Sequence, residues 1–353
     1  MEKIFAERTQ HLRKGCEKTE ERNKYIIKNR QSQTELLYFK KYHFSICEVP
    51  KAGSTLWAIL FLMLETPLSA ERILNTPRHE IHYKVKGERV QSNNELLKSS
   101  RIVVSRDPYA RLYSAFVDKI FLLRNVEYSN NLANSLQKGL SMTKAGPCGF
   151  DISFHEFVDK ETKNGLRGGH IDRHWGPIYT MCKACDIGYQ YIIQQETLTR
   201  DTEYIIGKLK TTTEIKATLW KLFHGSDSKK PIEVVLKTMW SDFDTPLMKK
   251  SCSNKLAFAM NLWDGFKLQG YIRTDAEFPL SFQESSNVNV DGFTKAILDE
   301  MYTNPLSSVE RKDQRRRALV KAYADMPRRI IAQIQQMYKM DFDLFNYDID
   351  PPT

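Results

Sequence analysis

The sequence predicts an α/β fold in which helices flank a central, mostly parallel sheet, and three stretches of the chain indicate it. Residues 43–49 read as a short buried strand, and a glycine-containing loop then leads into residues 55–65, which are apolar on nearly every side of a helix. Residues 101–105 and 189–193 read as further strands, each followed by a helical pattern. A strand, a glycine loop and a buried helix in this order are typical of the start of a nucleotide-binding α/β unit.

The composition limits the class of protein. The chain has 353 residues, of which 41% are hydrophobic, so it can form a sizeable core and is not expected to be disordered. Its formal net charge is +10, which favours anionic partners such as nucleotides, nucleic acids, acidic glycans or anionic lipids. The charge alone does not choose among these partners.

Changes in composition along the chain predict its organisation. Residues 1–40 are polar and rich in charged side chains, so we expect a helical, solvated stem ahead of a single domain at 41–350. Within that domain, residues 211–310 are mixed in character and read as a divergent insertion. The other expected segments are a loop at 125–150, a short helix at 151–160 and a strongly basic helical region at 310–340.

No segment is expected to span a membrane. The longest apolar run, Leu56–Leu64, is far shorter than the roughly 20 residues that a spanning helix needs. Residues 1–30 are charged throughout and lack the apolar centre of a secretory signal. We therefore expect either a cytosolic protein or one whose membrane anchor lies upstream of this sequence.

The cysteines leave the redox state open. The chain has six of them, which are too few for a fold built on disulfides at this length. The Cys182-x-x-Cys185 pair lacks two further ligands of convincing spacing for zinc, and it lacks the setting of a thioredoxin-like redox pair. We expect a structural disulfide from Cys182 or Cys185 to a distant cysteine, with free buried thiols as the alternative.

The first candidate site is the loop between the first strand and its helix. Gly53 allows a tight turn and a close approach of the backbone to an anion, and the N–H groups of the following helix point into the loop. Ser54 and Thr55 offer hydroxyl groups, and Lys51 offers a mobile positive charge. This loop predicts a phosphate site without the Gly-Lys-Ser/Thr order of a Walker loop. The alternative is an ordinary turn with a solvated lysine.

The second candidate site follows the second strand. Arg106 lies at the carboxyl end of that strand, where ligands bind in open α/β sheets, and a guanidinium can hold a phosphate through two parallel hydrogen bonds. Asp107 and Pro108 are expected to be the N-cap and the first residue of a helix. Arg111 and Ser114 share the polar face of this helix. The alternative is an Arg106–Asp107 pair that caps the helix, with Ser114 in solvent.

Together the two segments resemble the two cofactor motifs of the sulfotransferases that use 3′-phosphoadenosine 5′-phosphosulfate (PAPS). The resemblance implies a P-loop-like three-layer fold in which the loop binds the 5′-phosphosulfate of PAPS. It also implies that the arginine and the helix serine bind the 3′-phosphate. By resemblance, the first group is Lys51, Ala52, Gly53, Ser54, Thr55 and Leu56, and the second is Arg106 and Ser114. No metal is implied, because the leaving group departs as a stable anion.

The match extends to the Golgi carbohydrate sulfotransferases of the chondroitin and dermatan 4-O type, in sulfotransferase family 2. The similar segments are 106–116, His174-Trp175, Cys182-x-x-Cys185, Tyr191, Gln195–Leu198 and 337–347. Three residues depart from the usual family pattern. Ser54, Leu56 and Ala58 stand where the family usually has Cys, Asn and Lys. Ser54 is closer to the wider sulfotransferase pattern, so donor binding is expected to survive, whereas the acceptor is not implied by these residues.

The resemblance implies an enzyme that transfers a sulfuryl group to a hydroxyl of a glycosaminoglycan or glycoprotein glycan. The expected partner is an anionic or neutral glycan, and the expected place is the Golgi lumen, with a membrane reached only through an anchor outside this sequence. Lys51 is expected to neutralise charge on the leaving phosphate, while a general base removes the acceptor proton. Among His79, Glu80 and His82 we expect His82 to be the base, with His79 second, because histidine changes charge near neutral pH. The alternative is that all three are surface residues in a polar loop.

Two other classes of function remain open from the sequence. The first is a P-loop-type kinase or nucleotidase with a variant loop, against which the missing Gly-Lys-Ser/Thr order argues. The second is a catalytically inactive, basic protein that binds glycan or nucleic acid through Arg311, Lys312 and Arg315–Arg317. We expect no nucleic-acid partner, because no known module and no stacking aromatic side chains accompany this basic segment.

Overall fold

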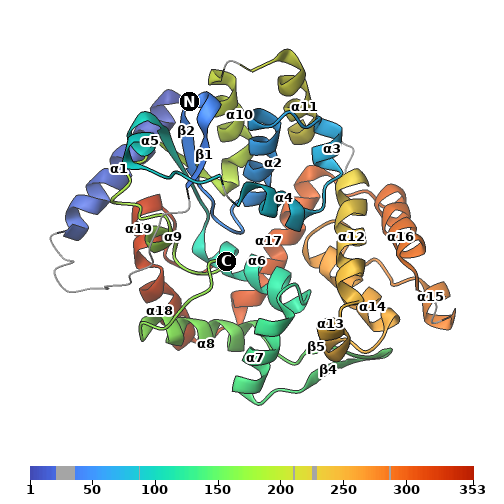
Figure 1. The fold of residues 1–353 in the computed structure, drawn as a ribbon. Coiled ribbons are helices and arrows are strands. Elements are labelled where there is room, and N and C mark those ends of the chain that lie inside the picture. Colours follow the sequence, from blue (N-terminus) through green and yellow to red (C-terminus); the bar gives the residue numbers. More distant parts are fainter. Residues whose placement is uncertain (21–35, 87, 210, 225–228, 286–287) are drawn as a thin grey trace. The chain divides into compact units, whose positions relative to one another are not determined.

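A computed structural model of the chain describes most of its residues (Figure 1). The described residues are 1–20, 36–86, 88–209, 211–224, 229–285 and 288–353. They form two compact units, which are described separately below. The first unit contains Met1–Arg111, Glu161–Lys230 and Ala332–Asp350, and the second contains Leu112–Lys160, Pro231–Ile331 and Pro351–Thr353.

The first unit is built on a four-stranded sheet. Its strands, in the spatial order of the sheet, are β1 (Leu36–Phe39), β2 (Phe44–Cys47), β3 (Ser100–Ser105) and β6 (Tyr191–Gln194). β2, β3 and β6 run parallel to one another, whereas the edge strand β1 is antiparallel to β2. This mostly parallel sheet with helices around it confirms the predicted fold class, and the three predicted strands correspond to β2, β3 and β6.

The central strands are apolar because both of their faces are covered. Ile102, Val103 and Val104 of β3 are all at most 1% exposed, as is usual for parallel strands with helices on both sides. The long helix α2 (Ser54–Glu65) packs against β1, while α1 (Glu2–Glu20) and α10 (Leu198–Lys208) pack against β6. Figure 1 shows α1 and α2 on opposite sides of the β1–β2 pair.

Helix α2 is the predicted buried helix, and aromatic rings fix it to the sheet. The ring centroids of Phe39 and Phe44 lie 4.0 Å apart, and that of Phe61 on α2 lies 5.1 Å from Phe39. Trp57, on the first turns of α2, is 1% exposed and meets both strand phenylalanines edge-on. This packing holds the first turn of α2, and hence the preceding loop, in a fixed place.

The N-terminal segment differs from the predicted solvated stem. Helix α1 buries Phe5 and Leu12, each only 3% exposed, and Arg8 donates to the carboxylate of Asp201 at 2.5 Å. Residues 36–39 form a strand instead of continuing a helix, because they pair with β2. The expectations for residues 21–35 fall outside the described residues. The assignment of 1–40 to a stem and of 41–350 to one domain stays a prediction.

The remaining helices of the first unit are mostly short. They are η2 (Lys40–Tyr42), α3 (Ala70–Leu74), α4 (Arg78–Val85), α5 (Asn93–Lys98), α9 (Ile178–Met181), η4 (Gln195–Thr197), α11 (Thr213–His224) and α19 (Lys339–Phe345). Helix α6 (Pro108–Phe116) begins in this unit and continues along the chain into the second. The helical pattern predicted after the strand at 189–193 corresponds to α10.

The second unit is mainly helical and contains a two-stranded hairpin. Its elements are η3 (Val117–Phe121), α7 (Val126–Leu136), β4 (Leu140–Thr143), β5 (Gly146–Phe150), α12 (Lys229–Phe243), α13 (Pro246–Ser251), α14 (Lys255–Leu268), α15 (Leu280–Ser285), α16 (Val290–Thr303) and α17 (Ser308–Ala324). Helices α8 (Phe154–Leu166) and α18 (Arg328–Met337) have residues in both units. Helices α17 and α18 match the predicted basic helical region. The reading of 211–310 as a divergent insertion stays a prediction.

The predicted loop at 125–150 is wrong. Asn125 caps α7 by accepting from the amide of Tyr128, and Ser129, Leu132 and Ala133 form the buried face of that helix. Of these three residues only Ser129 is polar, and it interrupts the apolar pattern of that face. The glycine-rich run 146–150 forms β5 because it pairs with β4 and because Cys148 is bonded to Cys252.

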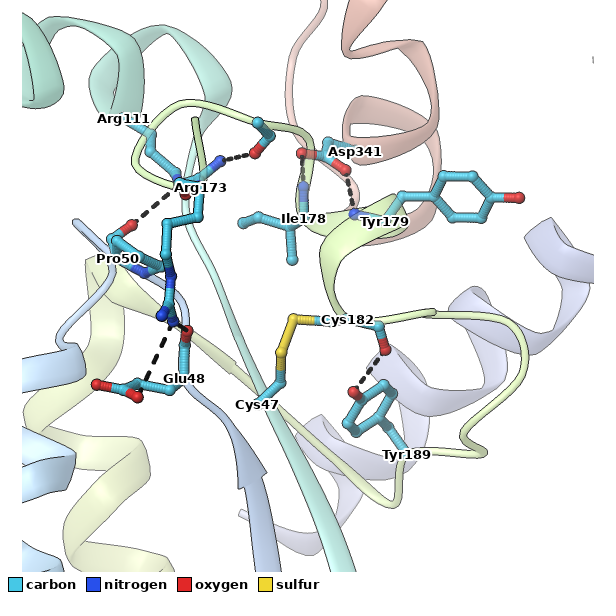
Figure 2. The surroundings of a disulfide bond; sticks show 11 residues. Cys47, Glu48, Pro50, Arg111, Arg173, Ile178, Tyr179, Cys182, Tyr189 and Asp341 are labelled. Carbon is cyan, nitrogen blue, oxygen red and sulfur yellow. Dashed lines mark hydrogen bonds and ion pairs between the residues drawn. A yellow bond between two sulfur atoms is a disulfide. The ribbon is translucent and has the colours of Figure 1, made fainter. Parts of the chain in front are cut away.

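All six cysteines form disulfides, so the prediction of a structural bridge is confirmed and the alternative of free thiols is wrong. The pairs are Cys16–Cys185, Cys47–Cys182 and Cys148–Cys252. Figure 2 shows the bond between Cys47, at the end of β2, and Cys182, which follows α9. The Asp341 carboxylate holds the start of α9 by accepting from the amides of Ile178 and Tyr179, each at 2.7 Å.

The described part of the chain has neither a membrane-spanning helix nor a cluster of metal-binding side chains. Across these ranges no helix combines the length and apolar character needed to cross a membrane. The same residues include no group of three or more His, Cys, Asp or Glu side chains placed to hold a metal ion.

Candidate active site

The loop between β2 and α2 has the backbone shape of an anion site. Lys51 has φ 68° and Gly53 has φ 90°, so two residues of this short loop occupy the left-handed region. The conformation at Gly53 favours glycine, and a Cβ there would also lie 2.8 Å from Cδ2 of Leu198, whose side chain would have to move. The left-handed Lys51 stores backbone strain, which is common in loops that bind ligands.

The loop ends at an open helix terminus. Helix α2 starts at Ser54, and its N-cap, Gly53, has no side chain to accept from the first-turn amides. These N–H groups lack partners within the helix and carry the positive end of its dipole, which favours an anion. Ser54 is buried and Thr55 is half-buried, whereas the side chain of Leu56 packs against the core. Leu56 could therefore serve an anion only through its backbone.

The structure brings the two predicted motifs together. Arg106, at the end of β3, donates from Nη1 to the backbone carbonyl of Lys51 at 2.5 Å. Its buried Nε has no hydrogen-bond partner among the described residues. Burial lowers the pKa of Arg106 to about 10, against the raising effect of Glu196 and Asp107, so the guanidinium stays charged at neutral pH. A positive side chain with an unused donor thus lies beside the loop.

Two carboxylates surround the start of α6. Asp107 Oδ1 accepts from the amide of Ala110 at 2.7 Å, which confirms its predicted role as the N-cap. The amide of Asp107 donates to Glu196 Oε1 at 3.1 Å, and the hydroxyl of Tyr347 donates to Glu196 Oε2 at 2.9 Å. Burial, together with a smaller effect of the nearby Glu196, raises the pKa of Asp107 to about 6. The site therefore contains a carboxyl group that titrates near neutral pH.

Replacing Asp107 with asparagine is expected to stabilise the protein most at high pH. The folded pKa of about 6 exceeds the ordinary 3.8, so the stabilising contribution of the protonated form is complete below pH 3.8 and is lost as the pH rises through about 6. Between about pH 4 and pH 7 the wild type should lose about 2–3 kcal/mol relative to Asp107→Asn. Asparagine is also a good N-cap, so the helix start is kept. Urea denaturation across this pH range measures the difference, and parallel stability curves for the two proteins would contradict it.

The polar face predicted for α6 is only partly exposed. Arg111 is 2% exposed, contrary to the predicted polar face, and it donates to the backbone carbonyls of Pro50, Gly176 and Arg173. Figure 2 shows its bond to Pro50. Ser114 is half-buried further along α6, in the stretch that belongs to the second unit. Its proposed contact with a 3′-phosphate stays a prediction.

Of the two candidate bases, His82 lies at the loop. Its Nε2 is 3.1 Å from the Thr55 hydroxyl oxygen, and its Nδ1 is 2.8 Å from Glu48 Oε1. His79 and Glu80 are exposed residues of the same helix, α4. Helix α4 packs on α2, which explains why His82 reaches the first turn of that helix.

Glu48 is a site residue that the sequence prediction missed. It is 5% exposed and accepts from Nη2 of Arg89 at 2.7 Å, while its backbone carbonyl accepts from Arg173 at 3.1 Å (Figure 2). Burial raises the pKa of its carboxyl group, but the bond from His82 and the charge of Arg89 outweigh burial and lower it overall. Its position between a buried strand and the loop lysine was the available signal, since an acidic residue there needs a partner.

The chain is an α/β protein in which a glycine loop and a charged arginine lie at neighbouring strand ends of a mostly parallel sheet, the edge at which open α/β sheets bind ligands. The sequence matches the profile of the Sulfotransferase family over residues 34–250, more than half of the chain. The chain belongs to this family. The predicted resemblance to sulfotransferase family 2 is thereby confirmed.

Curated relatives are similar to part of this chain. Carbohydrate sulfotransferase 9 of Homo sapiens is 27% identical over 209 residues, which cover 55% of this chain and 45% of that protein. Carbohydrate sulfotransferase 11 of Rattus norvegicus is 26% identical over 191 residues, which cover 49% of this chain and 53% of that protein. Carbohydrate sulfotransferase 10 of the same species is 26% identical over 227 residues, with coverages of 58% and 60%. The chain thus spans about half the length of the curated relatives that it matches, and no solved structure matches it significantly.

Proposed function

We propose that the protein transfers the sulfuryl group of PAPS to a hydroxyl group of a carbohydrate by in-line displacement. The observation that carries this proposal is the bond from Arg106 to the Lys51 carbonyl, which joins both donor motifs in a member of the sulfotransferase family. Family membership supports PAPS as the donor. The names of the relatives, which are carbohydrate sulfotransferases, support a glycan acceptor.

Donor binding is assigned to two groups of residues. Lys51, Ala52, Gly53, Ser54, Thr55 and Leu56 would hold the 5′-phosphosulfate, through backbone N–H groups, hydroxyls and the lysine ammonium. The amide of Ala52 donates to Val49 at 3.2 Å, so its contribution is to the shape of the loop. Arg106 and Ser114 would hold the 3′-phosphate. The Nε–H group of Arg106, which has no partner among the described residues, could donate a hydrogen bond to this phosphate.

The chemical step needs charge stabilisation and a base. As the acceptor oxygen bonds to sulfur, the bond from sulfur to the bridging phosphate oxygen breaks, and the electron pair leaves with 3′-phosphoadenosine 5′-phosphate (PAP). Lys51 would neutralise the charge that develops on that oxygen. His82 would take the proton of the acceptor hydroxyl, because it lies at the first turn of α2, whereas His79 is exposed.

Calorimetry with PAP tests the donor site. Wild-type protein is expected to bind PAP more tightly than adenosine 5′-phosphate, which lacks the 3′-phosphate. Arg106→Ala should weaken PAP binding by about 10- to 100-fold, because it removes a charged hydrogen bond worth about 1.5–3 kcal/mol. It should leave the weak binding of adenosine 5′-phosphate almost unchanged. Lys51→Ala should weaken the binding of both PAP and adenosine 5′-phosphate.

A matched control is Arg72→Ala, an exposed arginine in α3, which should bind PAP like the wild type. Equal affinity for PAP and adenosine 5′-phosphate, or preference for ATP with magnesium, would overturn the proposal in favour of a kinase or nucleotidase. Affinity for sulfated glycan or DNA without any PAP binding would indicate a basic binding protein instead.

The disulfides support a cellular location for the protein. Stable disulfides form in oxidising compartments, so three of them indicate passage through the secretory pathway. We assign the protein to the Golgi lumen, with a glycosaminoglycan or glycoprotein glycan as the acceptor. Labelled PAPS offered with a panel of such glycans identifies the acceptor and the sulfated position.

A further inference from the structure

Three hydrogen-bonded side chains connect the end of strand β2 to the loop between β2 and α2. We call this loop the donor loop, because it is proposed to bind the 5′-phosphosulfate of PAPS. Glu48 directly follows β2, His82 lies on α4, and Thr55 lies in the first turn of α2. The distances are 2.8 Å from Glu48 Oε1 to His82 Nδ1 and 3.1 Å from His82 Nε2 to Thr55 Oγ1. Glu48 was not predicted to take part in the reaction.

The ionised Glu48 fixes the direction of its bond to His82, and for a neutral ring the direction of the bond to Thr55 follows. The charges of Arg89 and Arg173 and the bond from His82 lower the pKa of the Glu48 carboxyl overall, so it is ionised and can only accept. Nδ1 of His82 must then carry a proton and donate it to Glu48. In the neutral ring Nε2 has the lone pair, so the hydroxyl of Thr55 donates to Nε2.

We infer that Glu48 is the positioning residue of the reaction: it holds His82 in the tautomer whose Nε2 lone pair faces the donor loop. This inference rests on the proposed function, in which His82 receives the acceptor proton. During transfer that proton moves to Nε2, while Nδ1 keeps its own proton and its bond to Glu48. Glu48 touches no substrate atom and acts only through His82.

Thr55 occupies the ring nitrogen of His82 that the acceptor hydroxyl would need. Its hydroxyl and the acceptor hydroxyl need the same Nε2 lone pair, so His82 can accept a substrate proton only after Thr55 turns to the phosphosulfate. Glu48 keeps the ring in place during this exchange, because its second oxygen is held at 2.7 Å by Arg89. The carboxylate is therefore fixed from two sides, as a positioning group requires.

The tautomer can be measured without any substrate. In protein labelled with ¹⁵N-histidine, long-range ¹H–¹⁵N spectra at pH 8 distinguish a protonated from an unprotonated ring nitrogen, and the spectrum of His82→Gln identifies the His82 signals. Nδ1 of His82 is expected to be protonated in the wild type. In Glu48→Gln the amide can donate to Nδ1, so a large share of the Nε2-protonated tautomer should appear. Arg89→Gln leaves the contact to Nδ1 and should keep the wild-type tautomer.

Activity then separates positioning from a purely structural role. Glu48→Gln should lower kcat by about 10²- to 10⁴-fold, by analogy with removing the orienting carboxylate of other histidine bases. The KM for PAPS should change by less than about threefold, because Glu48 does not contact the donor. Glu71→Gln, an exposed carboxylate on α3, serves as the matched control and should have wild-type kinetics.

A wild-type His82 protonated at Nε2 would overturn the inference, and besides the wild type this result needs only His82→Gln for the assignment of the signals, not a folded Glu48 variant. An unchanged tautomer together with an unchanged kcat in folded Glu48→Gln would also overturn it. These outcomes are independent of the donor test, since PAP calorimetry can fail while the His82 tautomer is as expected, and the reverse also holds.

Discussion

Replacing His82 with alanine is expected to reduce sulfuryl transfer by about 10²- to 10⁴-fold, the usual contribution of a positioned general base. The loss should fall on kcat, because in the proposed binding mode PAPS is held mainly by the loop and by Arg106. Removal of the ring also frees the Thr55 hydroxyl, whose bond to Nε2 is 3.1 Å long. Affinity for PAP should therefore change little or increase slightly.

The matched comparison is His79→Ala on the same helix. His79 is exposed, so this variant should keep most of the activity of the wild type. Initial rates with labelled PAPS, measured for both variants at several acceptor concentrations, give the required kcat and KM values. His82 would not be the base if the two variants lost similar amounts of activity. The same conclusion would follow if His82→Ala changed only the KM for PAPS and left kcat unchanged.

Removing the Cys47–Cys182 disulfide is expected to cost about 2–5 kcal/mol of unfolding free energy. The bond closes a loop with a sequence separation of 135 residues, so its loss gives the unfolded chain much more freedom. The native state is also affected, because Cys47 directly precedes Glu48 and the donor loop. A Cys47→Ala/Cys182→Ala double variant should therefore lose both stability and affinity for PAP.

The comparison variant is Cys148→Ala/Cys252→Ala, which opens a bond with a separation of 104 residues in the second unit. It should lose a similar amount of stability, while PAP binding at temperatures well below unfolding should be less affected. Guanidinium denaturation followed by tryptophan fluorescence gives the stabilities, and calorimetry gives the affinities. A Cys47→Ala/Cys182→Ala variant as stable as the wild type would contradict the expected role of the bond.

Local patterns were sufficient for the features that depend on neighbouring residues. The strands β2 and β3, the buried helix α2 and the Asp107 cap are each specified within a few positions of the chain. The loop at Gly53 was predictable because a left-handed turn before a helix requires glycine. Lys51 and Arg106 were each recognised from their neighbours in the sequence. Their contact was not predicted, because it depends on the parallel pairing of β2 with β3.

Features that depend on distant residues were missed or misread. Glu48 acquires its role only when α4 brings His82 beside β2, and nothing near Glu48 in the sequence indicates that partner. Arg111 was placed on a polar face because helical spacing shows where a side chain points and not what covers it. Helix α1 appeared solvated for the same reason, since Phe5 and Leu12 are its buried contacts with the core.

The burial of Arg111 has an electrostatic consequence for the donor loop. Its three described hydrogen bonds go to backbone carbonyls, so its charge is met by peptide dipoles and not by a bonded carboxylate. Burial lowers the pKa of this guanidinium, although an arginine remains charged at neutral pH. One of the carbonyls belongs to Pro50, directly before Lys51. In a poorly screened interior the field of Arg111 extends into the loop, so an anion there would be attracted by a cation that it never touches.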